Sequence, residues 1–406
     1  MPSIALFSSK FTNEDEIRQK LSVTLNMAVV EDADIFDTVC SHKKTTRTRL
    51  EQVVYKKTSV FNQFTMERER NVAHIKSGLA EKLGQEKNVM YCGYTTLLIP
   101  HDITHVLKVL IIDNHDLRVQ RGVGEGLSER EATKIIKAED LRVHGWSAFL
   151  YYKEAFDNSL YDIVIPVGSK SVDGVVELIR ENYNKTAVLE TMDSLQAVSD
   201  MALAAEVELA LLSKGQKIEV EVRNHCVSLK VNKSAFSFGN LTSKLIEIAG
   251  SIPGVESVEV LKGKGYQTSV YRDQHFELPP KVLLVDDEKE YVETLSERLV
   301  TRNVGSYAVF DGQEALDFID GDQPDVMVLD LKMPGINGIE VLKQTKKSNP
   351  HIEVIILTGH GSEADRETCM NLGAYAYLQK PTDIEKLSKT IAEAYKKIDT
   401  DRGKSA

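Results

Sequence analysis

The segment KVLLVDD, residues 281–287, decides the fold of the C-terminal part of this chain. Two prolines, at 279 and 280, stop regular structure just before it, and the apolar run that follows is typical of a strand buried on both faces. Apolar strands then alternate with helical patterns, which predicts a parallel sheet with crossover helices. The five strand segments are KVLLVDD, SYAVF (306–310), DVMVLD (325–330), EVIILTG (353–359) and AYAYLQK (374–380). We therefore predict an α/β domain over 281–400, with a linker over 273–280.

Three carboxylates follow strands of this predicted sheet. Asp286 and Asp287 end the first strand, and Asp330 ends the third. In a doubly wound sheet of order 2-1-3-4-5, the carboxyl ends of these two strands meet at the topological switch point, where ligands bind. Acids gathered there repel one another unless a cation neutralises them, and an all-oxygen ligand set with room for water suits Mg²⁺. One carboxylate could then attack phosphorus and become an acyl phosphate.

Two further residues complete the pattern, because Thr358 ends the fourth strand and Lys380 ends the fifth. A hydroxyl can bond one phosphoryl oxygen and an ammonium can neutralise another. With these residues in register, the segment resembles the receiver domain of two-component response regulators. The resemblance rests on LVDDE (284–288), VMVLDLKMPGINGIEVL (326–342), VIILTG (354–359) and AYLQKP (376–381), and it implies a flavodoxin-like (βα)5 fold.

The resemblance also implies roles for individual residues. Asp330 would be the phosphoacceptor, Asp287 a direct Mg²⁺ ligand, and Asp286 a ligand acting through water. The backbone carbonyl of Lys332 would complete the protein ligands of the metal. Mg²⁺ is thus the implied cofactor, and a histidine kinase or phosphotransfer protein is the implied partner.

A second set of roles concerns signalling after phosphorylation. The resemblance implies that Thr358 and Tyr377 are switch residues, that Lys380 contacts the phosphoryl group, and that the bond before Pro381 is cis. Tyr377 could alternatively be a half-buried aromatic residue on an edge strand.

Residues 189–272 have a different pattern, with a helix, two short strands, a second helix and a further strand. This α-β-β-α-β order resembles a small α+β BON domain, on VELALLS (207–213), KIEVEVRNHCVSLKV (217–231) and IAGSIPGVESVEV (248–260). The segment contains no catalytic constellation. Membrane or ligand contact is what the resemblance implies, and a packing or oligomerisation module, including one that forms a homodimer, stays equally open.

Residues 1–188 contain βα units, with strands predicted near IALF (4–7), NVMYCG (88–93), HVLKVLII (105–112) and YDIVIPV (161–167) and a long helical stretch between Thr45 and Leu83. They resemble cytidylate kinases and their relatives, which implies a P-loop-kinase-like α/β domain. The resemblance rests on GLSEREATKII (126–136) and SLYDIVIPVG (159–168). In such kinases the first loop reads GxxGxGK[ST], whereas this chain has SSKFTNEDE at 8–16. A loop that wraps phosphates needs glycines so that its backbone N–H groups can converge on the anion, and this loop has none, so we predict a domain without phosphoryl-transfer turnover.

The residues in place of that loop favour an ordinary helix start. Asn13 and Glu16 have the spacing of a capping box, and Glu14 and Asp15 add negative charge where a phosphate would bind. Lys10 is then a surface residue rather than a phosphate ligand.

Four arginines on helices of this domain have two open interpretations. They could be remnants of nucleotide contacts, as Lys10 could, or they could form ion pairs with neighbouring acids. They are Arg118, Arg121, Arg130 and Arg142.

The composition of the whole chain limits the remaining functions. With 406 residues and a net charge of −11, it is acidic and multidomain, and no charge excess favours nucleic acid. No apolar run is long enough for a membrane span, and the N-terminus lacks a secretion signal, so we expect a cytoplasmic protein.

The leading hypothesis is a response regulator whose receiver controls a kinase-like and a BON-like output that does not bind DNA. The alternatives are a nucleoside monophosphate (cytidylate) kinase gated by phosphorylation, and a nucleotide sensor. The sequence identifies no downstream partner.

Overall fold

The computed structural model describes residues 2–43, 45–56, 59–232, 238–263, 280–300, 302, 304–359 and 361–404. The chain divides into two compact units. The first contains Met1–Thr58, Arg68–Leu212 and Gln216–Gln274, and the second contains Ser59–Glu67, Ser213–Gly215 and His275–Ala406. Most of the linker predicted at 273–280 lies outside the described residues. The predicted domain boundaries stay predictions.

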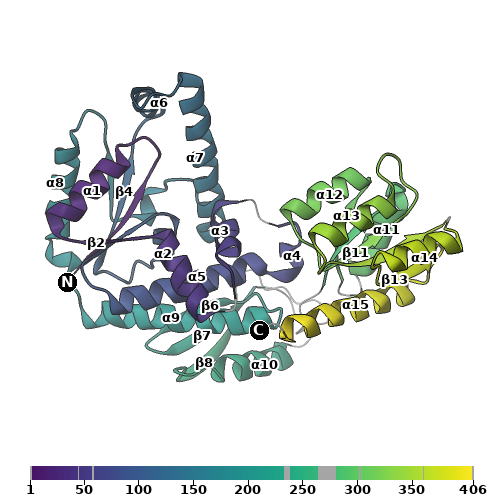
Figure 1. The fold of residues 1–406 in the computed structure, drawn as a ribbon. Helices are drawn as coiled ribbons and strands as arrows, with labels where there is room; N and C mark the ends of the chain where they lie inside the picture. Colours follow the sequence, from purple (N-terminus) through teal and green to yellow (C-terminus); the bar gives the residue numbers. More distant parts are fainter. Residues whose placement is uncertain are drawn as a thin grey trace. The chain divides into compact units, whose positions relative to one another are not determined.

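The first unit contains a five-stranded parallel sheet of order β2-β3-β1-β4-β5 (Figure 1). Its strands are β1 (Ser3–Ser8), β2 (Ala28–Glu31), β3 (Val89–Cys92), β4 (Val106–Ile112) and β5 (Ile163–Pro166). The helices of this part are α1 (Glu14–Leu25), α2 (Asp32–His42), α3 (Arg47–Tyr55), α5 (Glu67–Gln85), α6 (His115–Gly124), α7 (Glu129–Tyr151) and α8 (Val172–Tyr183). Short 3₁₀ helices cover η1 (Tyr94–Leu98), η2 (Asn158–Leu160) and η3 (Thr186–Val188).

The central strand β1 is buried on both faces, as an apolar run between parallel neighbours requires. Its alternate residues Ile4 and Leu6 pack with α1 and α8. Ala5 and Phe7 point to the other face and share a core with α2, α3, α5 and α7. The predicted α/β class of this part is confirmed.

Two local predictions differ from the structure. Strand β2 was not expected, because it is only four residues long and only one of them, Val30, is buried. The long helix expected between 45 and 83 is three helices, α3, α4 (Asn62–Thr65) and α5.

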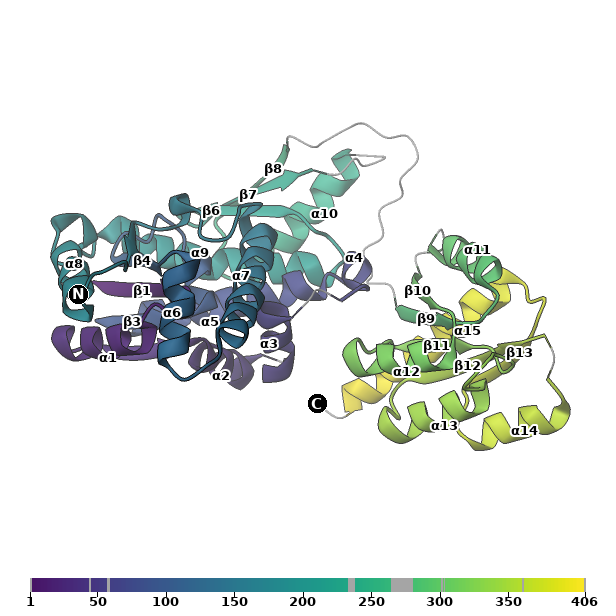
Figure 2. The same ribbon diagram turned by 90° about the horizontal axis from the view of Figure 1, so that it is seen from above.

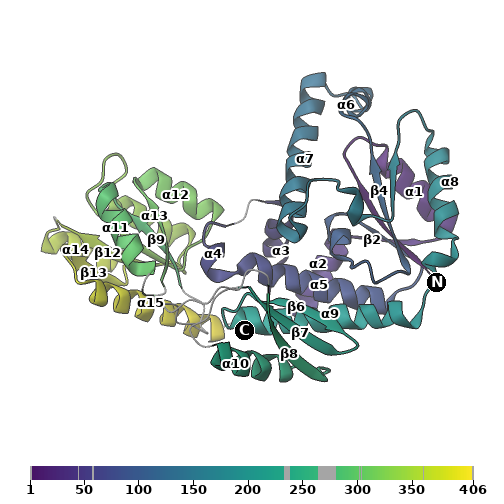
Figure 3. The ribbon, with the colours of Figure 1, turned by 180° about the vertical axis from the view of Figure 1, so that it is seen from behind.

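The middle part of the chain has the predicted α-β-β-α-β order (Figure 3). It comprises α9 (Met192–Ser213), β6 (Glu219–Arg223), β7 (Cys226–Val231), α10 (Phe238–Gly250) and β8 (Ser257–Lys262). Strands β6 and β7 are antiparallel, and Asn224 and His225 form the two-residue turn between them, both with positive φ. Helix α9 contributes Val198 and Met201 to the core of the first unit.

The second unit contains a parallel sheet of order β10-β9-β11-β12-β13, which is the predicted 2-1-3-4-5 arrangement. The strands are β9 (Lys281–Val285), β10 (Gly305–Val309), β11 (Val326–Leu329), β12 (Glu353–Thr358) and β13 (Ala376–Gln379). The helices are α11 (Lys289–Val300), α12 (Gly312–Gly321), α13 (Gly338–Ser348), α14 (Glu363–Asn371) and α15 (Ile384–Lys404).

Helices cover both faces of this sheet, as Figure 2 shows. Buried residues of α11 and α15 pack on one face, and those of α12, α13 and α14 pack on the other. The predicted flavodoxin-like (βα)5 fold is therefore present.

Candidate functional site

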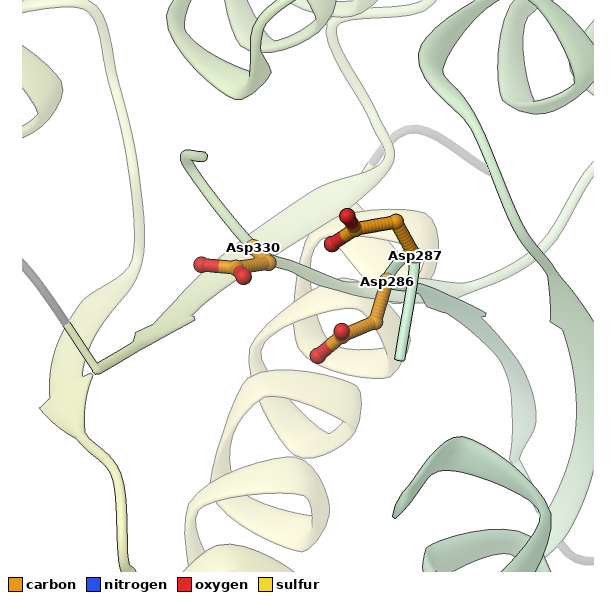
Figure 4. A group of neighbouring side chains, drawn as sticks. All are labelled: Asp286, Asp287 and Asp330. Carbon is orange, nitrogen blue, oxygen red and sulfur yellow. The ribbon is translucent and has the colours of Figure 1, made fainter. Parts of the chain in front are cut away.

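Three carboxylates gather at the carboxyl edge of the second unit's sheet (Figure 4). Asp286 and Asp287 follow β9, and Asp330 follows the neighbouring strand β11. Each offers an oxygen, and these oxygens all lie within 4.8 Å of one another. Asp286 and Asp330 are buried, whereas Asp287 is exposed. The predicted juxtaposition therefore exists in the fold.

Lys380 lies among these carboxylates. Its Nζ is 2.5 Å from Asp286 Oδ2, 3.2 Å from Glu288 Oε1 and 3.4 Å from Asp330 Oδ2. The ammonium also lies 4.6 Å from the ring centroid of Tyr291, a cation–π geometry. One cation thus faces several acids, and the cluster keeps an excess of negative charge.

Burial shapes the protonation of this pair. It raises the pKa of Asp286, against the stabilising effect of Lys380 on the charged form. Burial also lowers the pKa of Lys380, but the hydrogen bond to Asp286 and the surrounding carboxylates outweigh it, so the pKa lies above its ordinary value. Lys380 therefore stays charged at neutral pH.

Asp330 is held by its own backbone surroundings. Its Oδ1 accepts a hydrogen bond of 2.7 Å from the Leu331 N–H, which fixes the rotation of the carboxylate. Lys332 comes two residues later in the loop to α13 and has an exposed side chain. The role of its carbonyl as a metal ligand stays a prediction.

The two predicted switch residues lie on neighbouring strands. Thr358 ends β12 and is buried, and Tyr377 on β13 packs against the core with its hydroxyl buried. A Cβ at Gly361 would lie only 1.6 Å from that hydroxyl oxygen, so the ring fills the space beside this loop. The Lys380–Pro381 bond is cis, as expected.

The first loop of the kinase-like part is closed by a side chain. Glu14 accepts hydrogen bonds from the Thr12 N–H at 2.9 Å, the Phe11 N–H at 3.3 Å and Lys10 Nζ at 2.7 Å. Burial opposes ionisation of Glu14, but Lys10 and the loop amides hold its pKa below the usual range. The backbone donors of the loop thus bind a carboxylate of the chain itself.

The capping box predicted between Asn13 and Glu16 is wrong. Asn13 adopts a left-handed conformation, with φ 57°, and its side chain makes no capping hydrogen bond. Glu16 is exposed, and Asp15 pairs with Arg18 instead. Lys10, expected as a surface residue, is 39% exposed and paired with Glu14.

Arg118 and Arg121 are engaged by acids and carbonyls. Arg118 is buried, forms a bidentate pair with Asp140 at 2.8 and 2.9 Å, and donates to the Lys10 carbonyl. Arg121 pairs with Asp113 at 2.6 Å and donates to the Phe11 carbonyl. Both arginines therefore hold the backbone of the first loop through hydrogen bonds to its carbonyl groups.

Arg142 pairs with Glu139 at 2.5 Å on α7, at helical spacing. The structure thus places the predicted arginines Arg118, Arg121 and Arg142 in ion pairs.

The acids that complete these sites were not predicted from the sequence. Glu288 follows the two aspartates directly, and its position beside them could have indicated a contact with Lys380. Asp113 and Asp140 lie eight and 22 residues from their arginines, and only the packing of α6 on α7 and the loops brings them together.

Among the described residues, none of the helices is both long enough and apolar enough to cross a membrane.

Comparisons with known proteins match two parts of the chain. The model of the response regulator receiver domain matches residues 282–392, and that of the cytidylate kinase-like family matches residues 11–169.

Curated relatives include response regulator MprA of Mycolicibacterium vanbaalenii, 32% identical over 126 residues, which are 31% of this chain and 54% of that protein. MprA of Mycobacterium avium is 36% identical over 107 residues, which are 26% of this chain and 47% of the relative. The chain thus spans about half the length of the curated relatives it matches.

Solved structures include the receiver domain of a putative Luxo repressor protein from Vibrio parahaemolyticus. It is 28% identical and covers 32% of this chain and 99% of its own, with a TM-score of 0.31. The receiver domain of Francisella response regulator 1452 is 34% identical and covers 29% of this chain and 98% of its own, with a TM-score of 0.28. The family models and the curated relatives show that residues 282–392 are a receiver domain homologous to those of response regulators, and that the chain also carries a cytidylate kinase-like domain.

Proposed function

We propose that this chain is a response regulator whose receiver takes up one phosphoryl group on Asp330 in the presence of Mg²⁺. The observation that carries the proposal is the gathering of Asp286, Asp287 and Asp330 beside Lys380. A histidine kinase or a phosphotransfer protein would supply the phosphoryl group.

The residues present fit a magnesium ion. The donor set consists of carboxylate oxygens, two of the three acids are buried, and the one positive charge of Lys380 does not neutralise the three acids. Hard oxygen ligands with an open, solvent-facing side are what Mg²⁺ prefers. Asp287, Asp330 and the Lys332 carbonyl would hold the ion, with Asp286 acting through water. When bound, the ion would offset the negative charge of the incoming phosphoryl oxygens.

The chain's own residues would perform the transfer. An oxygen of Asp330 attacks phosphorus in line, forming an acyl phosphate, while the bond from phosphorus to the donor atom breaks and its electrons leave with the donor. The Leu331 N–H donates to Asp330 Oδ1 at 2.7 Å and so orients the carboxylate. Lys380 Nζ lies 3.4 Å from Asp330 Oδ2, where it would neutralise a phosphoryl oxygen. Thr358, at the end of the adjacent strand, would donate to another.

The output of the receiver would be a protein contact rather than DNA binding. The net charge of −11 supports this part of the proposal, as does a kinase-like domain whose loop amides bind Glu14. The middle part would act as a BON-like binding or oligomerisation module, and a cytoplasmic location remains part of the proposal.

Labelling with a small phosphoryl donor tests the proposal. The wild-type chain with Mg²⁺ should incorporate phosphate that is labile to acid and base, and Asp330→Asn should incorporate none. Asp320→Asn, at an exposed position on α12, is the matched control and should label like the wild type. Equal labelling of Asp330→Asn would overturn the assignment.

A further inference from the structure

Residues 59–67 belong to the second compact unit, although they lie far from the receiver in the sequence. They include the short helix α4, and contacts of Phe61 and Phe64 place this segment against α12 and β10 of the unit. In the chain they connect α3 to α5, both helices of the kinase-like core. The receiver thus packs against a segment that belongs, in sequence, to the kinase-like part of the chain.

An aromatic contact forms the centre of this packing. Phe61 is fully buried, with its ring 5.7 Å from Phe318 of α12 at 89° and 6.5 Å from Tyr307 of β10 at 76°. Tyr307 and Phe318 stack on each other at 5.0 Å. The centroid distances of the two edge-to-face pairs and of the stacked pair all lie in the range of favourable aromatic pairs. Phe61 is therefore an anchor in a site made of receiver side chains.

Polar contacts at both ends of the segment define its register. Asp322, at the end of α12, accepts hydrogen bonds from Ser59 Oγ at 2.6 Å and from the Val60 N–H at 3.1 Å. At the other end, Glu67 pairs with Lys281, the first residue of β9. Apolar, hydrogen-bonding and ionic contacts together make this a specific surface.

Gly305 shows how closely the segment approaches. A Cβ at this position would lie 2.7 Å from two ring atoms of Phe64 and 2.8 Å from its Cβ. Rotating the ring cannot relieve a clash with the Cβ, so only glycine fits at this point of β10 while α4 is docked.

Helix α12 also contacts the loop that follows the phosphoacceptor. A Cβ at Gly312, the first residue of α12, would lie 2.4 Å from the Ile336 carbonyl oxygen, and one at Gly338 would lie 2.1 Å from the Asp330 carbonyl oxygen. Packing is therefore continuous from Asp330 through this loop and α12 to Phe61, and a close-packed path of this kind transmits displacements.

We propose that the face formed by α12 and β10 is the surface through which this receiver acts on its own chain, and that it binds residues 59–67 as an intramolecular ligand. The proposal has a signalling half, that phosphorylation changes this contact, and a binding half, that the face holds residues 59–67. The signalling half rests on the proposed phosphorylation of Asp330, whereas the binding half does not.

Hydrogen exchange of the full chain tests the binding half. The amides of Phe64, Thr65 and Met66 donate within α4 at 2.9, 3.0 and 2.9 Å. A helix of four residues is not stable alone, so docking should slow their exchange on the order of tenfold or more.

Gly305→Ala should abolish this protection, and Gly321→Ala should keep it, because a Cβ at Gly321 meets nothing within 4 Å. Phe61→Ala removes the anchor without touching the receiver fold and should act like Gly305→Ala. If the amides of residues 59–67 in the wild type exchanged as fast as those of an unfolded chain, the binding half would be overturned.

Beryllofluoride with Mg²⁺, a mimic of the phosphoryl group, tests the signalling half. Exchange in residues 59–67 should change on the order of tenfold in the wild type but not in Asp330→Asn. A response around Asp330 without one in residues 59–67 would overturn this half. Absence of any response near Asp330 would instead contradict the proposed function and leave the binding half to the first experiment.

Discussion

Glu14 is where this chain departs from a nucleotide-binding loop. Its carboxylate is the acceptor for the Phe11 and Thr12 amides, so an internal anion occupies loop donors that a phosphate would need. Negative charge at the start of this helix was predicted from the sequence. The geometry of the helix start was not predicted, because Asn13 adopts a left-handed conformation and does not cap the helix as the spacing suggested.

Glu14 should make the stability of the first unit depend on pH. Its pKa is depressed in the folded state, so its stabilising effect is present above the unfolded pKa, near 4.3, and is lost as the pH falls through the folded value. Glu14→Gln should cost about 1 kcal/mol at neutral pH and much less at acid pH.

Denaturant unfolding followed by the fluorescence of Trp146 measures the free energy of unfolding at each pH, because this only tryptophan is buried in the first unit. An equal cost of Glu14→Gln at pH 7 and in acid would contradict the account.

The receiver acids were predictable for a physical reason. Parallel strands that share a sheet bring their carboxyl ends to one edge, so Asp286, Asp287, Asp330 and Lys380 follow from strand order alone. The partners of Arg118 and Arg121 were not predictable, since Asp140 and Asp113 reach them only through the packing of helices and loops.

The elements show the same distinction. Buried strands such as β9 and β11 could be located from their apolar runs. Strand β2 could not, because it is short and mostly exposed. The division of the predicted helix over 45–83 is explained by residues 59–67, whose Phe61 packs with the receiver instead of continuing the amphipathic pattern.

The loop after β12 offers a test of the switch. Gly361→Ala places a Cβ 1.6 Å from the Tyr377 hydroxyl oxygen and 3.0 Å from a Thr358 methyl group, so the half-buried ring must move. We expect a loss of stability on the order of 1 kcal/mol and a weakened response of α14 and β13 to beryllofluoride.

Gly359→Ala is the matched control in the same loop, because its Cβ would make only ordinary contacts with Lys380, at 3.9 Å. Denaturant unfolding and hydrogen exchange measure the two effects. A wild-type response in Gly361→Ala would show that the position of Tyr377 does not matter.

The chain as a whole combines a receiver with a cytidylate kinase-like domain. We predict that the purified protein forms no CDP from ATP and CMP. Repulsion between the Glu14 carboxylate and a phosphate at about 4 Å is worth on the order of 4 kcal/mol at an effective dielectric near 20, before lost hydrogen bonds are counted. A coupled assay for ADP and CDP measures turnover, and CDP formation that is lost in Lys10→Ala would show that the loop is functional.

Locating the phosphoryl group is the most direct test of the account. The full chain is incubated with a small phosphoryl donor and Mg²⁺, the acyl phosphate is reduced with borohydride, and the modified residue is identified by peptide mass spectrometry. We expect modification at Asp330 alone, and we expect none when Mg²⁺ is chelated or in Asp330→Asn. Modification at another residue, or equal modification without a divalent cation, would contradict the account.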